Sequence, residues 1–150
     1  MNKESKRNVY EQLKKDEGVK YEIYADHLGY LTFGVGHLVL MEDEEYAKRE
    51  GTPVSEERVA EAFQNDLNIA LRECRVLYEA FGTFPSEVQE ILVNMMFNMG
   101  RPRLSKFKNM NKALAIHDWK EAAKEGRDSA WHRQVTNRAE RLMGRMENVG

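Results

Sequence analysis

The sequence predicts a mainly helical α+β fold with one small sheet. Apolar side chains alternate with polar ones in a single stretch, residues 21–35, and this period of two is typical of a β-hairpin. Most of the remaining chain has apolar side chains at helical spacing. A length of 150 residues suits one domain with a sizeable core. We therefore expect a single domain, residues 1–150, in which helices surround one hairpin.

A short helix is predicted before the hairpin. Ser5 is its candidate N-cap, and Val9 and Leu13 lie one turn apart on its apolar face. Gly18 follows the expected end of this helix. Glu17 would then lie at the helix terminus and face the next element.

The hairpin has apolar side chains at alternate positions, Tyr21, Ile23 and Ala25 in the first strand and Leu31, Phe33 and Val35 in the second. Turn-forming residues 26–29 separate the two strands. Alternation places Thr32 on the face opposite Leu31 and Phe33.

The segment that follows the hairpin is strongly charged. Residues 41–53 are rich in acidic residues, with two basic ones, and the segment closes with Gly51 and Pro53, which predicts a solvated connection. Ser55 then caps a run with helical spacing that extends to about Tyr78, roughly 35 Å at 1.5 Å per residue. A helix of this length could join two lobes.

The next helix is predicted to be central. It opens with a Ser-x-x-Gln capping box at Ser86 and Gln89, ends at Gly100 and is apolar on most sides. Its methionines are therefore expected to be core residues.

Shorter helices complete the chain. Asp118 and Glu121 form another capping box, Gly126 is a C-cap candidate, and an amphipathic helix is expected at about residues 137–147. The single cysteine, Cys74, excludes an internal disulfide and lies on an apolar helical stripe, so we expect a buried thiol without a catalytic role.

Charge and hydropathy exclude several classes of function. The net charge is −2, distributed as −6 over residues 1–80 and +4 over residues 81–150. This basic excess is small compared with that of non-specific duplex-binding proteins, so nucleic-acid binding is not expected. No secretory h-region and no window of about 18 apolar residues is present, so neither a signal peptide nor membrane insertion is expected.

Two carboxylates near the hairpin suggest glycoside hydrolysis. In that reaction one carboxylic acid protonates the leaving oxygen, and one carboxylate aligns water or attacks the sugar. Glu17 and Asp26 are candidates, although acidic residues are too common in this chain for the spacing alone to be informative. They could act together only if the chain bends back at Gly18.

The stretch DEGVKYEIYADHLGYLTFGVGHLV resembles the active-site segment of the phage-type lysozymes, the family of the T-even bacteriophage lysozyme. All fixed positions of the family pattern are present: Asp16, Glu17, Gly18, Tyr24, Asp26, Gly29, Thr32, Gly34, Gly36 and His37. The similarity continues in AFQNDL, VNMMFNMG, Phe107, DWKEAAKEGRDSAWH and TNRAERL, in the order of the family.

This resemblance implies a two-lobed lysozyme fold. A small lobe with the sheet would cover about residues 17–54, and a connecting helix about residues 55–79. A helical lobe would cover about residues 80–150, joined by the helix at residues 5–16.

The resemblance also implies roles for individual residues. Glu17 would be the general acid, Asp26 the carboxylate that positions and activates water, and Thr32 the hydroxyl that holds this water. Arg138 would approach Glu17 from the carboxy-terminal helices. No cofactor and no metal ion is implied.

Other matching positions are structural or less specific. His37 and Asp66 match a structural ion pair of the family. Leu38 and Phe97 match positions that line the sugar-binding cleft, but each is apolar and could equally belong to the core. The chain is shorter than the T-even relative between His37 and Phe63, so the resemblance does not predict the width of the cleft.

The expected function is hydrolysis of the β-1,4 bond between N-acetylmuramic acid and N-acetylglucosamine in peptidoglycan, with inversion. The expected setting is a monomeric phage lysis enzyme in the host bacterial cytoplasm that needs a holin to reach the cell wall. An acquired antibacterial lysozyme is an alternative setting. Rival functions are a lytic transglycosylase, against which Asp26 and Thr32 argue, and a catalytically inactive wall-binding or helix-interaction module.

Overall fold

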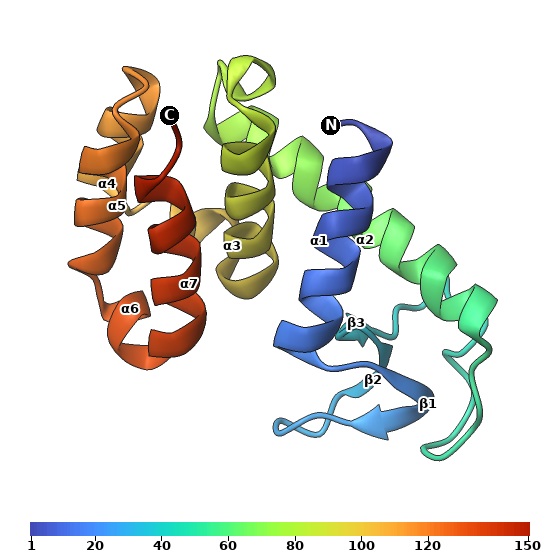
Figure 1. The fold of residues 1–150 in the computed structure, drawn as a ribbon. Coiled ribbons are helices and arrows are strands. Elements are labelled where there is room, and N and C mark those ends of the chain that lie inside the picture. The colour runs from blue at the N-terminus through green and yellow to red at the C-terminus, as the bar shows by residue number, and fades with distance from the viewer. The chain divides into compact units, whose positions relative to one another are not determined.

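The computed structural model describes all 150 residues, Met1–Gly150. Helices dominate, and one small antiparallel sheet lies near the amino terminus, so the predicted α+β class is confirmed (Figure 1). No helix combines the length and apolar character needed to cross a bilayer. The elements are α1 (Lys3–Glu17), β1 (Lys20–Ala25), β2 (Leu31–Gly34), β3 (His37–Leu38), α2 (Glu56–Leu77), the 3₁₀ turn η1 (Phe81–Thr83), α3 (Ser86–Leu104), α4 (Lys108–Ala115), α5 (Trp119–Arg127), α6 (Ala130–Gln134) and α7 (Thr136–Glu147).

The chain forms two compact units. The sheet-bearing unit comprises Tyr10–Ile69, and the helical unit comprises Met1–Val9 together with Ala70–Gly150. Helices α1 and α2 each contribute residues to both units. The lobe boundaries implied by the resemblance, with whole helices as connectors, remain a prediction.

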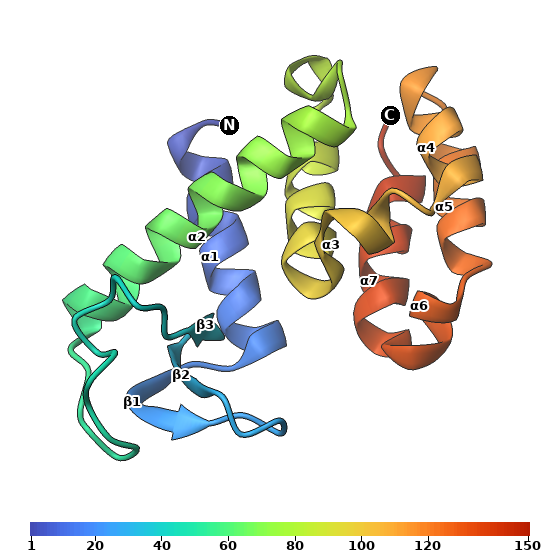
Figure 2. The ribbon, with the colours of Figure 1, turned by 180° about the vertical axis from the view of Figure 1, so that it is seen from behind.

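The sheet contains three strands in the order β1-β2-β3 (Figure 2). The predicted hairpin corresponds to β1 and β2, which pair antiparallel with Tyr24 opposite Thr32. Strand β3 was not predicted because its two residues are too short to show alternation. It pairs with β2 and places Leu38 opposite Thr32 and His37 opposite Phe33.

Helix α1 begins earlier than predicted, and Ser5 is not its cap. The side chain of Asn2 accepts a hydrogen bond from the Ser5 N–H at 2.8 Å, which is the geometry of an N-cap. Ser5 is instead buried, and its hydroxyl donates to Glu90 at 2.9 Å. The predicted apolar face is confirmed, since Val9 and Leu13 are both buried.

Helix α2 agrees with its prediction. The hydroxyl of Ser55 accepts a hydrogen bond from the Arg58 N–H, so the predicted cap is confirmed. Cys74 is fully buried, and burial raises the pKa of its thiol to about 12. At neutral pH this thiol is therefore not a thiolate, which agrees with the structural role expected for it.

Helix α3 is the buried centre of the helical unit, as predicted from its apolar character. The chain leaves helical geometry at Gly100, which has a φ of 78°, before a last turn completes the element. The predicted capping box is wrong, because Pro85 occupies the N-cap position and Ser86 makes no capping bond. Gln89 donates instead to the carbonyl of Phe84 at 2.9 Å.

Helix α5 packs against both α4 and α7 (Figure 1). Its predicted cap is confirmed, since Asp118 accepts a hydrogen bond from the Glu121 N–H. Gly126 is not a C-cap but lies inside α5, where an added Cβ would clash with the sulfur of Met143. A side chain at this position would displace the Met143 side chain, so the glycine favours the close approach of α5 and α7. Helix α7 matches the amphipathic helix expected at this end of the chain.

Candidate active site

Glu17 is the last residue of α1 and is exposed. The helix ends there because Gly18 adopts a φ of 78°, a left-handed conformation that few other residues tolerate. The chain then turns directly into β1, which begins at Lys20. The bend that the two-carboxylate hypothesis required at Gly18 is therefore present.

Asp26 closes the hairpin between β1 and β2. Its Oδ1 accepts hydrogen bonds from the backbone N–H groups of Leu28 and Tyr30, each at 2.9 Å. Its own N–H donates to the carbonyl of Tyr30, so cross-strand pairing continues one residue beyond the end of β1. Both bonds to the side chain use Oδ1, so Oδ2 keeps its capacity to accept a hydrogen bond from water.

Thr32 lies in the middle strand and is buried, with 5% of its surface exposed. Its hydroxyl donates to the carbonyl of Tyr30 at 3.1 Å. Directly opposed residues in an antiparallel sheet share a face, so Tyr24, Thr32 and Leu38 form a row across the three strands. Asp26 follows Tyr24 by two positions and therefore extends this face.

Tyr24 lies within electrostatic range of both carboxylates, although the sequence pattern predicts no role for it. Burial raises the pKa of its phenol, and the charges of Asp26 and Glu17 raise it further. Both carboxylates therefore lie close enough to act on the same phenol. Glu17, Asp26 and Thr32 all belong to the sheet-bearing unit, and their joint action in catalysis remains a prediction.

His37 supports this face of the sheet from the other side. Its Nδ1 and Nε2 lie 2.8 Å from carboxylate oxygens of Asp66 and Asp43, respectively, so the predicted pairing with Asp66 is present. Burial opposes protonation, but these hydrogen bonds and charges raise the pKa of His37 above its usual value. The ring of His37 also packs against Phe33, whose neighbour in the strand is Thr32.

The charged segment after the sheet is not fully solvated, contrary to the prediction. Glu45 is only 3% exposed and accepts hydrogen bonds from the guanidinium of Arg58, the shortest at 2.9 Å. Arg58 also bonds Asp43 at 3.1 Å and lies over the ring of Phe33. This network is difficult to predict from the sequence, because Glu45 lies within a run of similar acidic residues.

Three further residues were predicted to lie near the substrate or the general acid: Leu38, Phe97 and Arg138. Leu38 is 46% exposed, which excludes the core alternative for this residue. Phe97 is partly buried in α3. Arg138 donates to the side chain of Asn94 at 2.9 Å within the helical unit. The sugar-binding roles of Leu38 and Phe97 and the pairing of Arg138 with Glu17 remain predictions.

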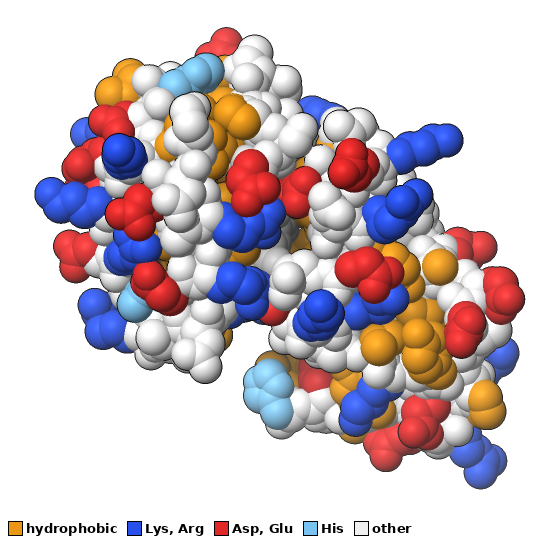
Figure 3. Space-filling model, in the orientation of Figure 1, with side chains coloured by type: hydrophobic (Ala, Val, Ile, Leu, Met, Phe, Trp, Pro, Cys, Tyr) orange, Lys and Arg blue, Asp and Glu red, His pale blue; other side chains and the backbone are white.

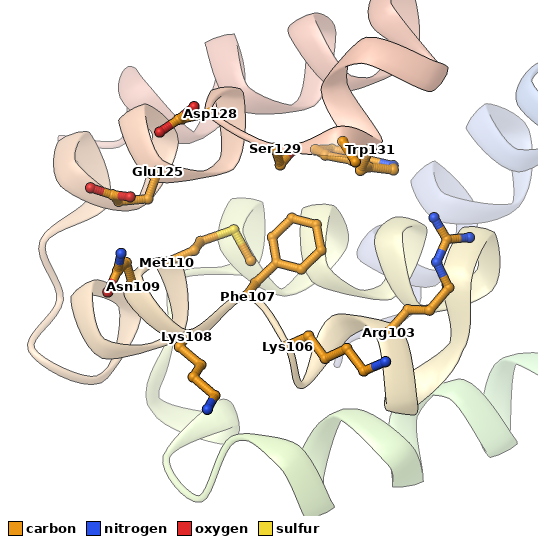
Figure 4. A pocket seen from close by; sticks show the side chains of 11 residues that line it. Arg103, Lys106, Phe107, Lys108, Asn109, Met110, Glu125, Asp128, Ser129 and Trp131 are labelled. Carbon is orange, nitrogen blue, oxygen red and sulfur yellow. The ribbon is translucent and has the colours of Figure 1, made fainter.

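A separate groove of about 440 Å³ lies within the helical unit (Figure 4). Phe107, Met110 and Trp131 contribute apolar surface to it. Its charged lining is mixed and comprises Arg103, Lys106, Lys108, Glu125 and Asp128. Acidic and basic side chains are likewise interspersed on the face shown in Figure 3. The groove therefore does not select an anion or a cation by charge alone.

Comparison with known proteins identifies the family. Residues 14–148 match the phage lysozyme family. The chain is 30% identical to "Probable T4-type lysozyme 1" of Dictyostelium discoideum, over 93% of this chain and 94% of that protein. It is also 30% identical to "Pre-baseplate central spike protein Gp5" of Enterobacteria phage T4, over 95% of this chain but only 29% of that protein.

A further relative is "Peptidoglycan hydrolase gp36" of Pseudomonas phage phiKMV, which is 31% identical over 93% of this chain and 15% of that protein. The chain thus spans nearly the whole of the first of these relatives and a minor part of the two phage proteins. The family match includes Glu17, Asp26 and Thr32 and reaches almost to the carboxy terminus. This chain therefore belongs to the phage lysozyme family, whose members are peptidoglycan-hydrolysing enzymes.

Proposed function

We propose that this protein hydrolyses the β-1,4 bond between N-acetylmuramic acid and N-acetylglucosamine in bacterial peptidoglycan. Glu17 is the general acid, and Asp26 and Thr32 hold and activate the attacking water. The main supporting observation is the shared sheet face, on which Thr32 is opposite Tyr24 and Asp26 lies two positions further along the strand. Diagonal neighbours of this kind are about 7 Å apart, a separation that one water molecule can bridge.

Hydrogen-bond directions define how the water would be held. The Thr32 hydroxyl donates its proton to the Tyr30 carbonyl, so it can only accept a hydrogen bond from water. Asp26 accepts a second hydrogen bond through Oδ2, since Oδ1 is used by the turn. A water that donates both hydrogens to the protein presents a lone pair to the anomeric carbon.

In the bond-breaking step, one carboxyl group donates a proton and the other accepts one. Glu17 transfers its proton to the glycosidic oxygen as the bond to the anomeric carbon breaks. Water attacks that carbon from the opposite side and gives a proton to Asp26. A single displacement predicts inversion, so the first-formed reducing sugar has the α configuration. NMR before mutarotation measures this outcome, and an initial β product or a covalent sugar adduct would contradict it.

Product analysis tests the function against its nearest rival. Purified peptidoglycan is digested, and the released fragments are examined by mass spectrometry. Hydrolysis gives reducing muramic acid ends, whereas a lytic transglycosylase gives 1,6-anhydro ends. A folded protein that binds the wall but releases no fragments would support the inactive module. Loss of turbidity of outer-membrane-permeabilised Gram-negative cells gives a second, independent measurement.

Thr32 provides a test of water positioning. Thr32→Val keeps the branched shape but removes the acceptor for water, so we expect kcat to fall about a hundredfold. Thr32→Ser restores the hydroxyl, and we expect its kcat to lie within about tenfold of the native value. Steady-state kinetics on soluble glycan strands measures both variants. Equal loss in Val and Ser variants would show that packing, rather than the hydroxyl, determines activity.

The biological setting remains part of this proposal. We expect a monomer that acts on peptidoglycan without a cofactor. If the protein is a phage lysis enzyme, it is made in the host bacterial cytoplasm and depends on a holin for access to the wall. Deleting the holin gene of the source genome should then delay lysis while the enzyme accumulates inside cells.

A further inference from the structure

We propose that Tyr24 is a substrate-binding residue of this site, whose phenolic hydroxyl donates a hydrogen bond to an oxygen of the sugar chain. The inference rests on the proposed function and extends its set of residues. The ligand atom is a neutral saccharide oxygen, such as a ring hydroxyl or an N-acetyl carbonyl.

Sheet register places Tyr24 at the centre of the proposed site. It is directly opposite Thr32, and such pairs have Cβ atoms about 5 Å apart on one face. It also precedes Asp26 by two positions on the same edge of the hairpin. The phenol therefore shares its face with both groups that would hold the attacking water.

The Tyr24 side chain is held in place but its hydroxyl is not used. The residue is partly buried in β1, and the ammonium of Lys20 lies 4.5 Å from the centre of its ring. This contact between a cation and the ring face favours the observed position of the ring. The hydroxyl makes no hydrogen bond to another part of the chain, so it is available to a ligand.

The chemical state of Tyr24 suits a hydrogen-bond donor. Burial and the nearby charges of Asp26 and Glu17 raise the pKa of the phenol, so it remains protonated throughout the range in which a carboxylic acid catalyst works. A neutral donor does not compete with Glu17 for the role of acid. It favours a neutral acceptor on the sugar, because the site already contains two carboxylates.

Tyr24→Phe removes only the hydroxyl and is the primary test. Binding is measured by calorimetry with soluble peptidoglycan glycan strands in a Glu17→Gln background, which prevents turnover. We expect the Kd to rise about three- to tenfold, the effect of one neutral hydrogen bond. In the background with native Glu17, KM should rise by the same factor while kcat stays within about twofold.

Tyr46→Phe is the matched control, because Tyr46 is exposed in the same unit and its hydroxyl also makes no hydrogen bond. We expect no change in Kd or KM for this variant. If Tyr24 has only a structural role, Tyr24→Phe should lower the thermal unfolding temperature and the fraction of active protein. KM should then be unchanged. Unchanged Kd and KM in Tyr24→Phe would overturn the proposal. Absence of reducing ends with the native protein would instead reject the proposed function itself.

Discussion

Glu17→Gln should leave the protein folded and lower its activity on peptidoglycan by at least about a thousandfold. Glutamine preserves the size and polarity of the side chain but has no proton to transfer to the leaving oxygen. Glu17 lies at the exposed end of α1, outside the apolar core, so the substitution should disturb packing little. Release of reducing ends from purified peptidoglycan measures the loss.

Glu57→Gln provides the matched control for this experiment. Glu57 is an exposed carboxylate in the first turn of α2 and has no ion-pair partner. We expect activity within about twofold of the native value, because an exposed charge of this kind affects only long-range electrostatics. Circular dichroism should confirm that both variants are folded. Native-like lysis by folded Glu17→Gln protein would remove Glu17 from the role of acid.

The hairpin shows how much of the fold around the candidate site could be predicted from sequence, whereas the residue roles came from the resemblance. The alternation of side chains over residues 21–35 predicts the hairpin, and the glycine after Glu17 predicts the end of α1; both are local signals. Ser5 and Ser86 show the limit of such signals. Each fits a capping motif, but Asn2 caps α1 and Pro85 precedes α3. Local motifs compete with neighbouring candidates, and tertiary contacts decide between them.

Glu45 and Gly126 show what local patterns cannot predict. Glu45 lies in a run of acidic residues, but its burial depends on a partner 13 positions later, Arg58. Gly126 resembles a helix terminus, but it lies inside α5, where the sulfur of Met143 on another helix occupies the space of a side chain. Both depend on contacts between distant segments, which neither composition nor periodicity encodes.

Arg58→Met should be the most destabilising of the substitutions considered. Arg58 is the only basic partner of the buried Glu45, and it also bonds Asp43. Removing one member of a buried pair leaves an uncompensated charge, so we expect a loss of about 3 kcal/mol in the free energy of unfolding. Methionine keeps much of the side-chain volume over Phe33, so the loss reports mainly on charge. Urea unfolding measures it.

Two further variants separate charge from packing. Arg72→Met changes an exposed arginine of the same helix that has no ion-pair partner, and its stability should lie within about 0.5 kcal/mol of the native value. Adding Glu45→Leu to Arg58→Met removes the stranded charge and should restore at least half of the lost stability. A double variant no more stable than Arg58→Met would show that the stranded charge of Glu45 is not the cause of the lost stability.

The pH dependence of the unfolding free energy tests whether the pair of Arg58 and Glu45 stabilises the fold. Hydrogen bonds from Arg58 hold the pKa of Glu45 below its usual range. The pair therefore stabilises the fold at a pH above the usual pKa of a glutamate. This stabilisation is lost as the pH falls through the lowered pKa of Glu45. In Arg58→Met the carboxylate is buried without a partner, so protonation becomes favourable. The stability difference between native protein and variant should therefore shrink between about pH 7 and pH 4. A constant difference over this range would show that Glu45 is not left charged and buried.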